Sequence, residues 1–152
     1  MAGVEVDRTV SFSAQAASDP TAIKAKVYEY YRAVNESRWD DVVDFFHEDA
    51  VLLVPSQEPK VGHEAIRTFY ESHGRRFVEH HDDVPLLMID GQRVMTLVDF
   101  HGRDRNGIDV QFWTAGFFTI ECGKVRQYRV IFDTAALNEH LAAIRAAYDA
   151  EA

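Results

Sequence analysis

The sequence has a single cysteine, no cluster of basic residues and no long apolar run. Because Cys122 stands alone, no disulfide forms within the chain, and a reducing compartment is permitted. The net charge is −9 and the Lys and Arg residues are scattered, which excludes the basic surface that nucleic acid or an anionic membrane requires. The first residues, MAGVEVDRTV, are unlike a signal peptide because they carry acids and lack an apolar run. We therefore expect a soluble, cytoplasmic protein that binds neither nucleic acid nor membrane.

What the sequence does contain is a large apolar share: 47% of its 152 residues are hydrophobic and 12% are aromatic. A chain of this length forms one domain with a sizeable core. Residues 1–17 show no periodicity, and we expect an N-terminal arm there, either loose or paired as an edge strand. A single domain is predicted over residues 18–152.

The first predicted helix begins at Asp19, a favoured N-cap residue, with Pro20 at the first helical position. Apolar residues then recur at helical spacing on one stripe, formed by Ile23, Val27, Tyr30 and Val34. This stripe places Tyr30 on the buried face of the helix.

The remaining elements follow from the period of the apolar residues. A second helix is predicted over residues 39–50, a buried strand over 50–55 and a third helix over 63–77. The period then changes to two, which predicts strands over residues 80–90, 93–102, 107–120 and 124–133. A C-terminal helix from about residue 134, capped by Asp133 or Thr134, completes the chain. Helices followed by a curved antiparallel sheet define the α+β class.

The strand over residues 107–120 is apolar on both faces, whereas an antiparallel sheet packed on its own helices needs only one apolar face. The second face therefore needs another cover, and a second copy of the sheet is the simplest one. We expect a homodimer through the convex face of the sheet, formed by Leu97, Trp113 and Phe117.

Several features together resemble the nuclear transport factor 2-like superfamily, and most closely its SnoaL-like and ketosteroid-isomerase-like branch. They are the three N-terminal helices, a strand that ends before Pro55, the helix motif G-x-x-A-I-R-x-F-Y and the final strand G-K-V-x-x-x-R-x-x-F-D. The resemblance covers roughly residues 20–133. It implies a cone-shaped α+β roll, in which helices close over the concave face of the sheet and leave a deep apolar pocket. Such motifs specify a fold better than an activity.

The resemblance to the isomerases is partial at the residues that carry their activity. It places Tyr30 on their oxyanion-hole tyrosine and Tyr70 on a second pocket tyrosine. Their general-base aspartate corresponds to Val54, and the protonated aspartate of their oxyanion hole corresponds to Gly116. Steroid-type isomerisation with those carboxyl groups is therefore not expected.

The limonene-epoxide-hydrolase pattern is also incomplete. The aspartate of its last strand corresponds to Val130, and its strand arginine and aspartate correspond to Val98 and Phe100. Epoxide opening by that triad is not expected.

The strand register that the family implies directs one set of side chains into the pocket. The expected substrate-binding residues are Tyr70, Val54, Thr96, Val98, Phe112, Thr114, Phe118, Val130 and Phe132. Tyr128 faces the pocket in the same register, while Asp99 and His101 point to the convex surface.

The stretch FVEHHDD, residues 77–83, holds the densest group of titratable side chains. Strand alternation points His80 and Asp82 inward, and His81 and Asp83 outward. Two inward ligands are too few for a metal site, so no metal is expected. The inward residues are either a solvated polar strand end near the pocket mouth or an acid–base pair.

The first hypothesis for function is an enzyme without metal or organic cofactor. It would be a lyase, isomerase or cyclase that acts on an apolar, oxygenated small molecule of the polyketide or terpenoid kind. His80 is the expected general base or acid, assisted by Asp82. Tyr30 and Tyr128 are expected to donate hydrogen bonds to a developing oxyanion. The alternative is a non-catalytic module for small-molecule binding or dimerisation, which the loss of both carboxylate bases favours.

Overall fold

The structure, a computed structural model, describes residues 19–151, so the arm expected over residues 1–17 lies outside the described residues. Three helices come before the long strands: α2 (Pro20–Asn35), α3 (Trp39–Asp44) and α4 (Gly62–Arg76). The strands β1 (Phe46–Leu53) and β2 (Lys60–Val61) lie between α3 and α4. The chain continues with β3 (Phe77–Asp90), β4 (Arg93–Asp104), β5 (Asp109–Glu121), β6 (Lys124–Phe132) and α5 (Thr134–Glu151).

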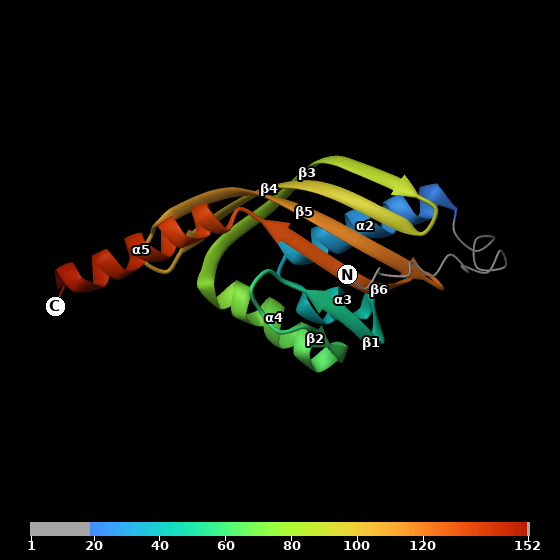
Figure 1. Cartoon of the computed structure of the whole chain (residues 1–152), viewed down its shortest axis with the longest axis horizontal. Helices are drawn as coiled ribbons and strands as arrows, with labels where there is room; N and C mark the ends of the chain where they lie inside the picture. The colour runs from blue at the N-terminus through green and yellow to red at the C-terminus, as the bar shows by residue number, and fades with distance from the viewer. Residues whose placement is uncertain (1–18, 152) are drawn as a thin grey trace, which may run out of the picture.

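These strands form one six-stranded sheet in the order β2-β1-β6-β5-β4-β3. Neighbouring strands pair antiparallel, except that β1 and β6 run parallel. In Figure 1 the long strands curve over the N-terminal helices, while α5 extends outward from one end of the sheet. The predicted α+β class is confirmed, and the sheet is mixed rather than purely antiparallel.

The first predicted helix is confirmed as α2, including its start. The side chain of Asp19 accepts a hydrogen bond from the backbone N–H of Thr21 at 3.1 Å, and Pro20 occupies the first turn. The predicted apolar stripe is buried, and Tyr31 is buried beside Tyr30. The burial of two adjacent tyrosines places both phenols under the sheet.

The second predicted helix is wrong at its C-terminal end. α3 ends at Asp44, and residues 46–53 form the strand β1. The reason is a pairing between segments far apart in the sequence, in which Leu52 lies beside Tyr128 of β6. Phe46 and Leu52 are fully buried, and this burial outweighs the local helical propensity of the segment.

The chain passes directly from α4 into β3, which begins at Phe77 rather than at His80. Pairing with β4 is regular from Glu79 to Asp83, and the register shifts on either side of this stretch, between Phe77 and Glu79 and between Asp83 and Leu86. Side chains therefore alternate without interruption through residues 80–83.

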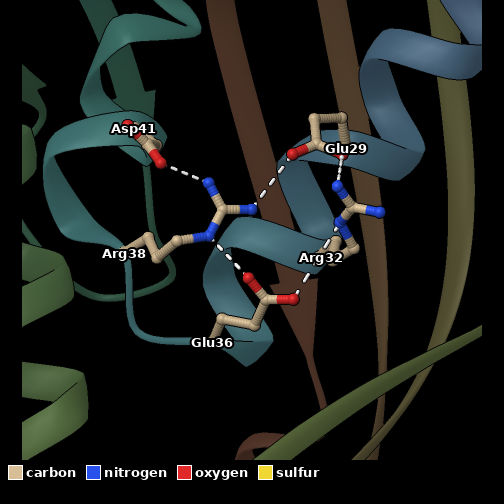
Figure 2. Close-up of polar contacts among 5 residues, drawn as sticks. All are labelled: Glu29, Arg32, Glu36, Arg38 and Asp41. Atoms are coloured by element: carbon tan, nitrogen blue, oxygen red, sulfur yellow. Dashed lines mark hydrogen bonds and ion pairs between the residues drawn. The ribbon is translucent and has the colours of Figure 1, made fainter.

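A network of ion pairs holds the corner between α2 and α3 (Figure 2). Arg38 donates to Glu29 at 3.0 Å, to Glu36 at 2.6 Å and to Asp41. Arg32 pairs with Glu29 at 3.0 Å and lies 3.9 Å from Glu36, so that two arginines share two carboxylates. All five side chains are partly solvent-exposed, so each ion pair contributes little to the free energy of unfolding. Together the ion pairs fix the direction of the chain at this corner.

The corner contains Ser37, whose backbone φ of 56° is unusual for a residue with a side chain. The Ser37 hydroxyl is hydrogen-bonded to Nε2 of His80 at 2.9 Å. Trp39 follows the corner and packs on Gly74 of α4, where a Cβ atom would lie 2.7 Å from the indole ring. The corner thereby places Trp39 between α4 and β3.

The C-terminal helix α5 begins as predicted after Asp133, whose Oδ1 accepts a hydrogen bond from the backbone N–H three residues on. His140 is its buried contact with the sheet, and Nε2 of His140 lies 3.5 Å from Oδ2 of Asp104. Leu137, Leu141 and Ile144 recur at helical spacing on α5 and are partly buried. Among residues 19–151, no helix is long and apolar enough to cross a membrane.

Candidate active site

A cavity of about 700 Å³ lies between the concave face of the sheet and the helices α2 and α4. Its polar wall includes Tyr30, Tyr31, Tyr70, Tyr128, Asp82 and His73. Its apolar wall includes Phe69, Phe77, Phe100, Phe112, Phe132, Val34, Val54 and Val130. Its rim carries the polar residues Gln57, Lys60, Glu64, Thr68, Ser72 and Arg76. A cavity of this size and character suits a small organic molecule that is mostly apolar.

Four buried tyrosines form most of the polar wall. The hydroxyls of Tyr30 and Tyr70 are hydrogen-bonded to each other, and the hydroxyl of Tyr31 is bonded to Oγ1 of Thr96 at 2.6 Å. Burial is the main cause that raises the pKa of all four phenols, Tyr128 included. The phenols therefore keep their protons at neutral pH and are available as hydrogen-bond donors.

Tyr128 occupies the space above Gly116 of β5. A Cβ atom at this glycine would lie 2.9 Å from the Tyr128 hydroxyl oxygen and 2.7 Å from Oγ1 of Thr96. Phe118 stacks on Tyr128 with ring centroids 4.1 Å apart and fixes the plane of the phenol. The Tyr128 hydroxyl thus lies beside the position at which the isomerase resemblance implies an oxyanion-hole acid.

The substitution Gly116→Ala should displace Tyr128 and lower the free energy of unfolding by about 1–3 kcal/mol, because the added methyl group overpacks the wall. Urea unfolding measures this loss. The control Thr119→Ser, at an exposed position of the same strand, should change the free energy of unfolding by less than about 0.5 kcal/mol. Equal unfolding midpoints for Gly116→Ala and the wild type would contradict the close packing.

Asp82 brings the one carboxyl group of the polar wall. Its backbone is clamped by Asn35 of α2: the Asp82 N–H donates to Asn35 Oδ1 at 2.7 Å, and Asn35 Nδ2 donates to the Asp82 carbonyl at 3.1 Å. Within residues 19–151, no hydrogen bond reaches the Asp82 carboxyl group itself. Burial raises the pKa of this carboxyl to about 7, although nearby His81 lowers it and Asp83 raises it slightly further.

The carboxyl and the phenols influence one another electrostatically. An ionised Asp82 contributes to raising the pKa of Tyr31, Tyr70 and Tyr128, with burial the larger cause in each case. The four groups therefore face a common space, and a ligand in the cavity can contact an acid–base group and hydrogen-bond donors together.

His80 shares the face of β3 with Asp82, as the alternation predicts, but it is not part of the cavity wall. Trp39 stacks on its ring at a centroid distance of 5.8 Å, and the Ser37 hydroxyl is bonded to its Nε2. Burial, and secondarily His81, lower the pKa of His80. The expected pairing of His80 with Asp82 in the cavity is therefore absent, because the α2–α3 corner covers the histidine.

The other expected lining residues divide into two groups. Tyr30, Tyr70, Tyr128, Val54, Phe112, Thr114, Val130 and Phe132 lie in the cavity wall. Thr96, Val98 and Phe118 do not reach the cavity and are at most 2% exposed. The register of these three is as predicted, but side chains such as Tyr31 and Tyr128 lie over them.

Two polar residues of the cavity were missed as site residues by the sequence reasoning. Tyr31 follows Val27 at the i+4 spacing of the buried stripe, a signal that was available. His73 lies on the cavity side of α4, two turns after the buried Ile66, and the same helical spacing was the signal that could have found it. Across the described part of the chain, no group of three or more His, Cys, Asp or Glu side chains is close enough to hold a metal ion.

The convex face of the sheet carries large apolar side chains. Trp113 is 50% exposed and Phe117 is 40% exposed, while Leu97 is partly buried. The strand register extends this surface across four strands, since Leu86, Leu97, Ala115 and Ile131 form one cross-strand row.

The SnoaL-like domain family matches residues 27–128, more than half of the chain, and the chain therefore belongs to this family. No curated protein matches the chain.

Three solved structures share the fold. SalBIII, an epoxide hydrolase/cyclase-like enzyme with a role in pyran ring formation in the polyether salinomycin, is 26% identical with a TM-score of 0.70, over 78% of this chain and 95% of that one. A putative SnoaL-like polyketide cyclase from Jannaschia sp. CCS1 is 18% identical with a TM-score of 0.72, and the match covers 79% of this chain and 92% of that one. An LEH-like epoxide hydrolase from M. tuberculosis is 20% identical with a TM-score of 0.69, and the match covers 87% of this chain and 98% of that one. These matches confirm the cone-shaped α+β roll.

Proposed function

We propose that the chain is an enzyme that moves a proton on an apolar, oxygenated small molecule, with Asp82 as its general base and acid. The observation that carries the proposal is a cavity-lining carboxyl group whose pKa burial raises to about 7, beside four protonated phenols. A base with a pKa near the operating pH transfers protons most effectively. The reaction class is a lyase, isomerase or cyclase reaction.

The chemistry follows from the placement of these groups. The ionised Asp82 accepts a proton from the carbon next to a substrate carbonyl, and the electron pair of that C–H bond moves onto the carbonyl oxygen. Tyr30 and Tyr128 donate hydrogen bonds to the resulting oxyanion, as preorganised donors in a mostly apolar cavity. Protonated Asp82 then returns the proton, either to another carbon in an isomerisation or to a departing hydroxyl, which leaves as water.

The family and one relative support a reaction of this class. Membership of the SnoaL-like family establishes the fold, and one fold can support several activities. The reaction class is therefore inferred from the residues of the site. SalBIII, the 26% identical relative, acts in pyran ring formation, which is a cyclisation of an oxygenated molecule. We infer a substrate of similar overall character, with an apolar body and at least one carbonyl or hydroxyl group.

His80 has a supporting function in this proposal. Its ring stacks on Trp39, and Trp39 in turn stacks on Tyr70 at a centroid distance of 6.1 Å. Tyr70 is hydrogen-bonded to Tyr30. His80 thus contributes to holding the phenols in place, and Asp82 takes the proton.

The test needs no knowledge of the natural substrate. β-Tetralone has an apolar ring body and exchangeable protons next to a carbonyl, and its deuterium incorporation in heavy water is followed by NMR. The wild-type protein should accelerate this exchange over buffer with saturation at high tetralone concentration. Saturable binding of tetralone without acceleration would favour the non-catalytic binding module instead.

We also propose that two copies of the chain associate through the convex face. The apolar row across β3–β6, with Trp113 and Phe117 beside it, is a continuous surface that a second identical sheet covers by two-fold symmetry. The cavity opens on the other face, so both active sites stay accessible.

The variant Phe117→Arg should shift the protein from dimer to monomer, because the interface would then bury an unpaired charge on each copy. Sedimentation velocity at micromolar concentration measures the change. The control Thr119→Arg carries the same charge two residues away, near the end of the strand, and should weaken the dimer less. A wild-type protein that sediments as a monomer would contradict the proposal.

A further inference from the structure

His73 is a polar residue of the cavity wall that the proposed mechanism does not use. It lies in the last turn of α4, and its ring contacts His80 and Phe77 at centroid distances of 5.2 Å each and Phe100 at 5.4 Å. Apart from His80, these neighbours are apolar. In residues 19–151, neither imidazole nitrogen of His73 has a hydrogen-bond partner.

The imidazole is partly exposed, and it borders the cavity. Since no described protein group is hydrogen-bonded to its nitrogens, the cavity is the side on which they can form hydrogen bonds. A ligand that covers such a group without bonding to it leaves a polar group unsatisfied, whereas a ligand with a matching oxygen gains a hydrogen bond.

The protonation state of His73 defines what it offers. Burial, followed by the proximity of His80 and Arg76, lowers the pKa of His73 to about 3. The imidazole is neutral at physiological pH, with one nitrogen that donates a hydrogen bond and one that accepts. A neutral hydroxyl or carbonyl group of a ligand suits it better than a carboxylate or a phosphate.

We propose that His73 is a ligand-contacting residue that hydrogen-bonds a second oxygen substituent of the substrate, while Asp82 and the phenols hold the reacting one. The inference rests on the proposed function of the cavity, and it narrows the substrate class to molecules with oxygen substituents at two separated positions. Residues 80 and 82 lie about 7 Å apart along β3. Because His73 contacts His80, the imidazole of His73 and the carboxyl group of Asp82 are separated by a distance on the order of the length of two fused rings.

The experiment uses two probes that differ by one hydroxyl group. β-Naphthol carries one hydroxyl, and the matching naphthalenediol carries a second hydroxyl at the far end of the ring system. The wild-type protein should bind the diol about 2–12-fold more tightly, which corresponds to one hydrogen bond. In His73→Leu this ratio should fall to about one, and His73→Asn, which keeps a donor and an acceptor, should retain part of it. Calorimetric titration of both probes against each variant gives the ratios.

The controls separate this inference from the proposed function. His81→Asn, on the exposed side of β3, should keep the wild-type ratio. An unchanged ratio in His73→Leu would overturn the inference and leave the cavity as a binding site. Failure of the wild-type protein to bind either naphthol would count against both proposals. The melting temperature of His73→Leu should equal or exceed that of the wild type, and a clearly lower value would mean that the imidazole serves the fold instead.

Discussion

The variant Asp82→Asn should exchange the α-protons of β-tetralone about 10²–10⁴-fold more slowly than the wild-type protein, the range typical for loss of a general base. The amide has nearly the shape of the carboxyl group but cannot accept the proton. Asn35 holds the backbone of residue 82 through two hydrogen bonds, so the substitution should leave the cavity intact.

The matched control for this prediction is Asp83→Asn. Asp83 is exposed on the opposite side of β3 and contacts His81 at 3.1 Å, away from the cavity. Its substitution should change the exchange rate by less than a factor of about three, which corresponds to the small effects of surface changes. If Asp82→Asn keeps its activity while His80→Ala loses it, then His80 is the base and the assignment of Asp82 is wrong.

The same substitution should make the protein more stable at neutral and alkaline pH. Burial raises the pKa of Asp82 from 3.8 to about 7, which means that the fold disfavours the ionised carboxyl. Three pKa units correspond to about 4 kcal/mol as an upper bound. At pH 8 the free energy of unfolding of Asp82→Asn should exceed that of the wild type by an amount approaching this figure.

The sign of the effect sets its pH window. Between pH 4 and pH 7 folded Asp82 holds its proton while the unfolded chain has released it, so the folded state binds more protons. The contribution of Asp82 to the free energy of unfolding is therefore fully present below about pH 4, decreases as the pH rises, and is lost above about pH 7. The difference between the variant and the wild type should grow across this window.

Urea unfolding of the wild type and of Asp82→Asn at a series of pH values measures the difference. Asp83→Asn again serves as the control, because its stability relative to the wild type should grow much less between pH 4 and pH 7, Asp83 being the smallest of the three influences on the pKa of Asp82. A difference that is constant with pH would mean that the Asp82 carboxyl is not held in its neutral form. Lower activity together with higher stability is the pattern expected of a functional group that the fold accommodates at a cost.

Local rules predicted the parts of the structure that depend on a few neighbouring residues. The N-cap at Asp19 and the stripe through Tyr30 follow from spacing and capping, and both are confirmed. The inward direction of Asp82 follows from strand alternation, which holds because the two register shifts of β3 lie before Glu79 and after Asp83.

The parts that could not be predicted depend on contacts between distant segments. The strand β1 begins at Phe46 because it pairs with β6, and nothing local to residues 46–50 announces that pairing. His80 faces inward as predicted, but Trp39 covers it from a corner some forty residues earlier in the chain. Alternation gives the direction of a side chain and says nothing about what lies on top of it.

The close approach of Tyr128 to Gly116 has a consequence for how this site can change. The space beside Gly116 is occupied by two hydroxyl groups, that of Thr96 on β4 and that of Tyr128 on β6. A carboxyl group at position 116 and a large phenol at position 128 exclude each other, so a larger residue at position 116 clashes unless Tyr128 is first replaced by a smaller one. The polar group at this place can be a carboxyl group from β5 or a phenol from β6, but not both. Conversion of one site into the other therefore requires two coupled substitutions, and the change to a smaller residue at position 128 has to come first.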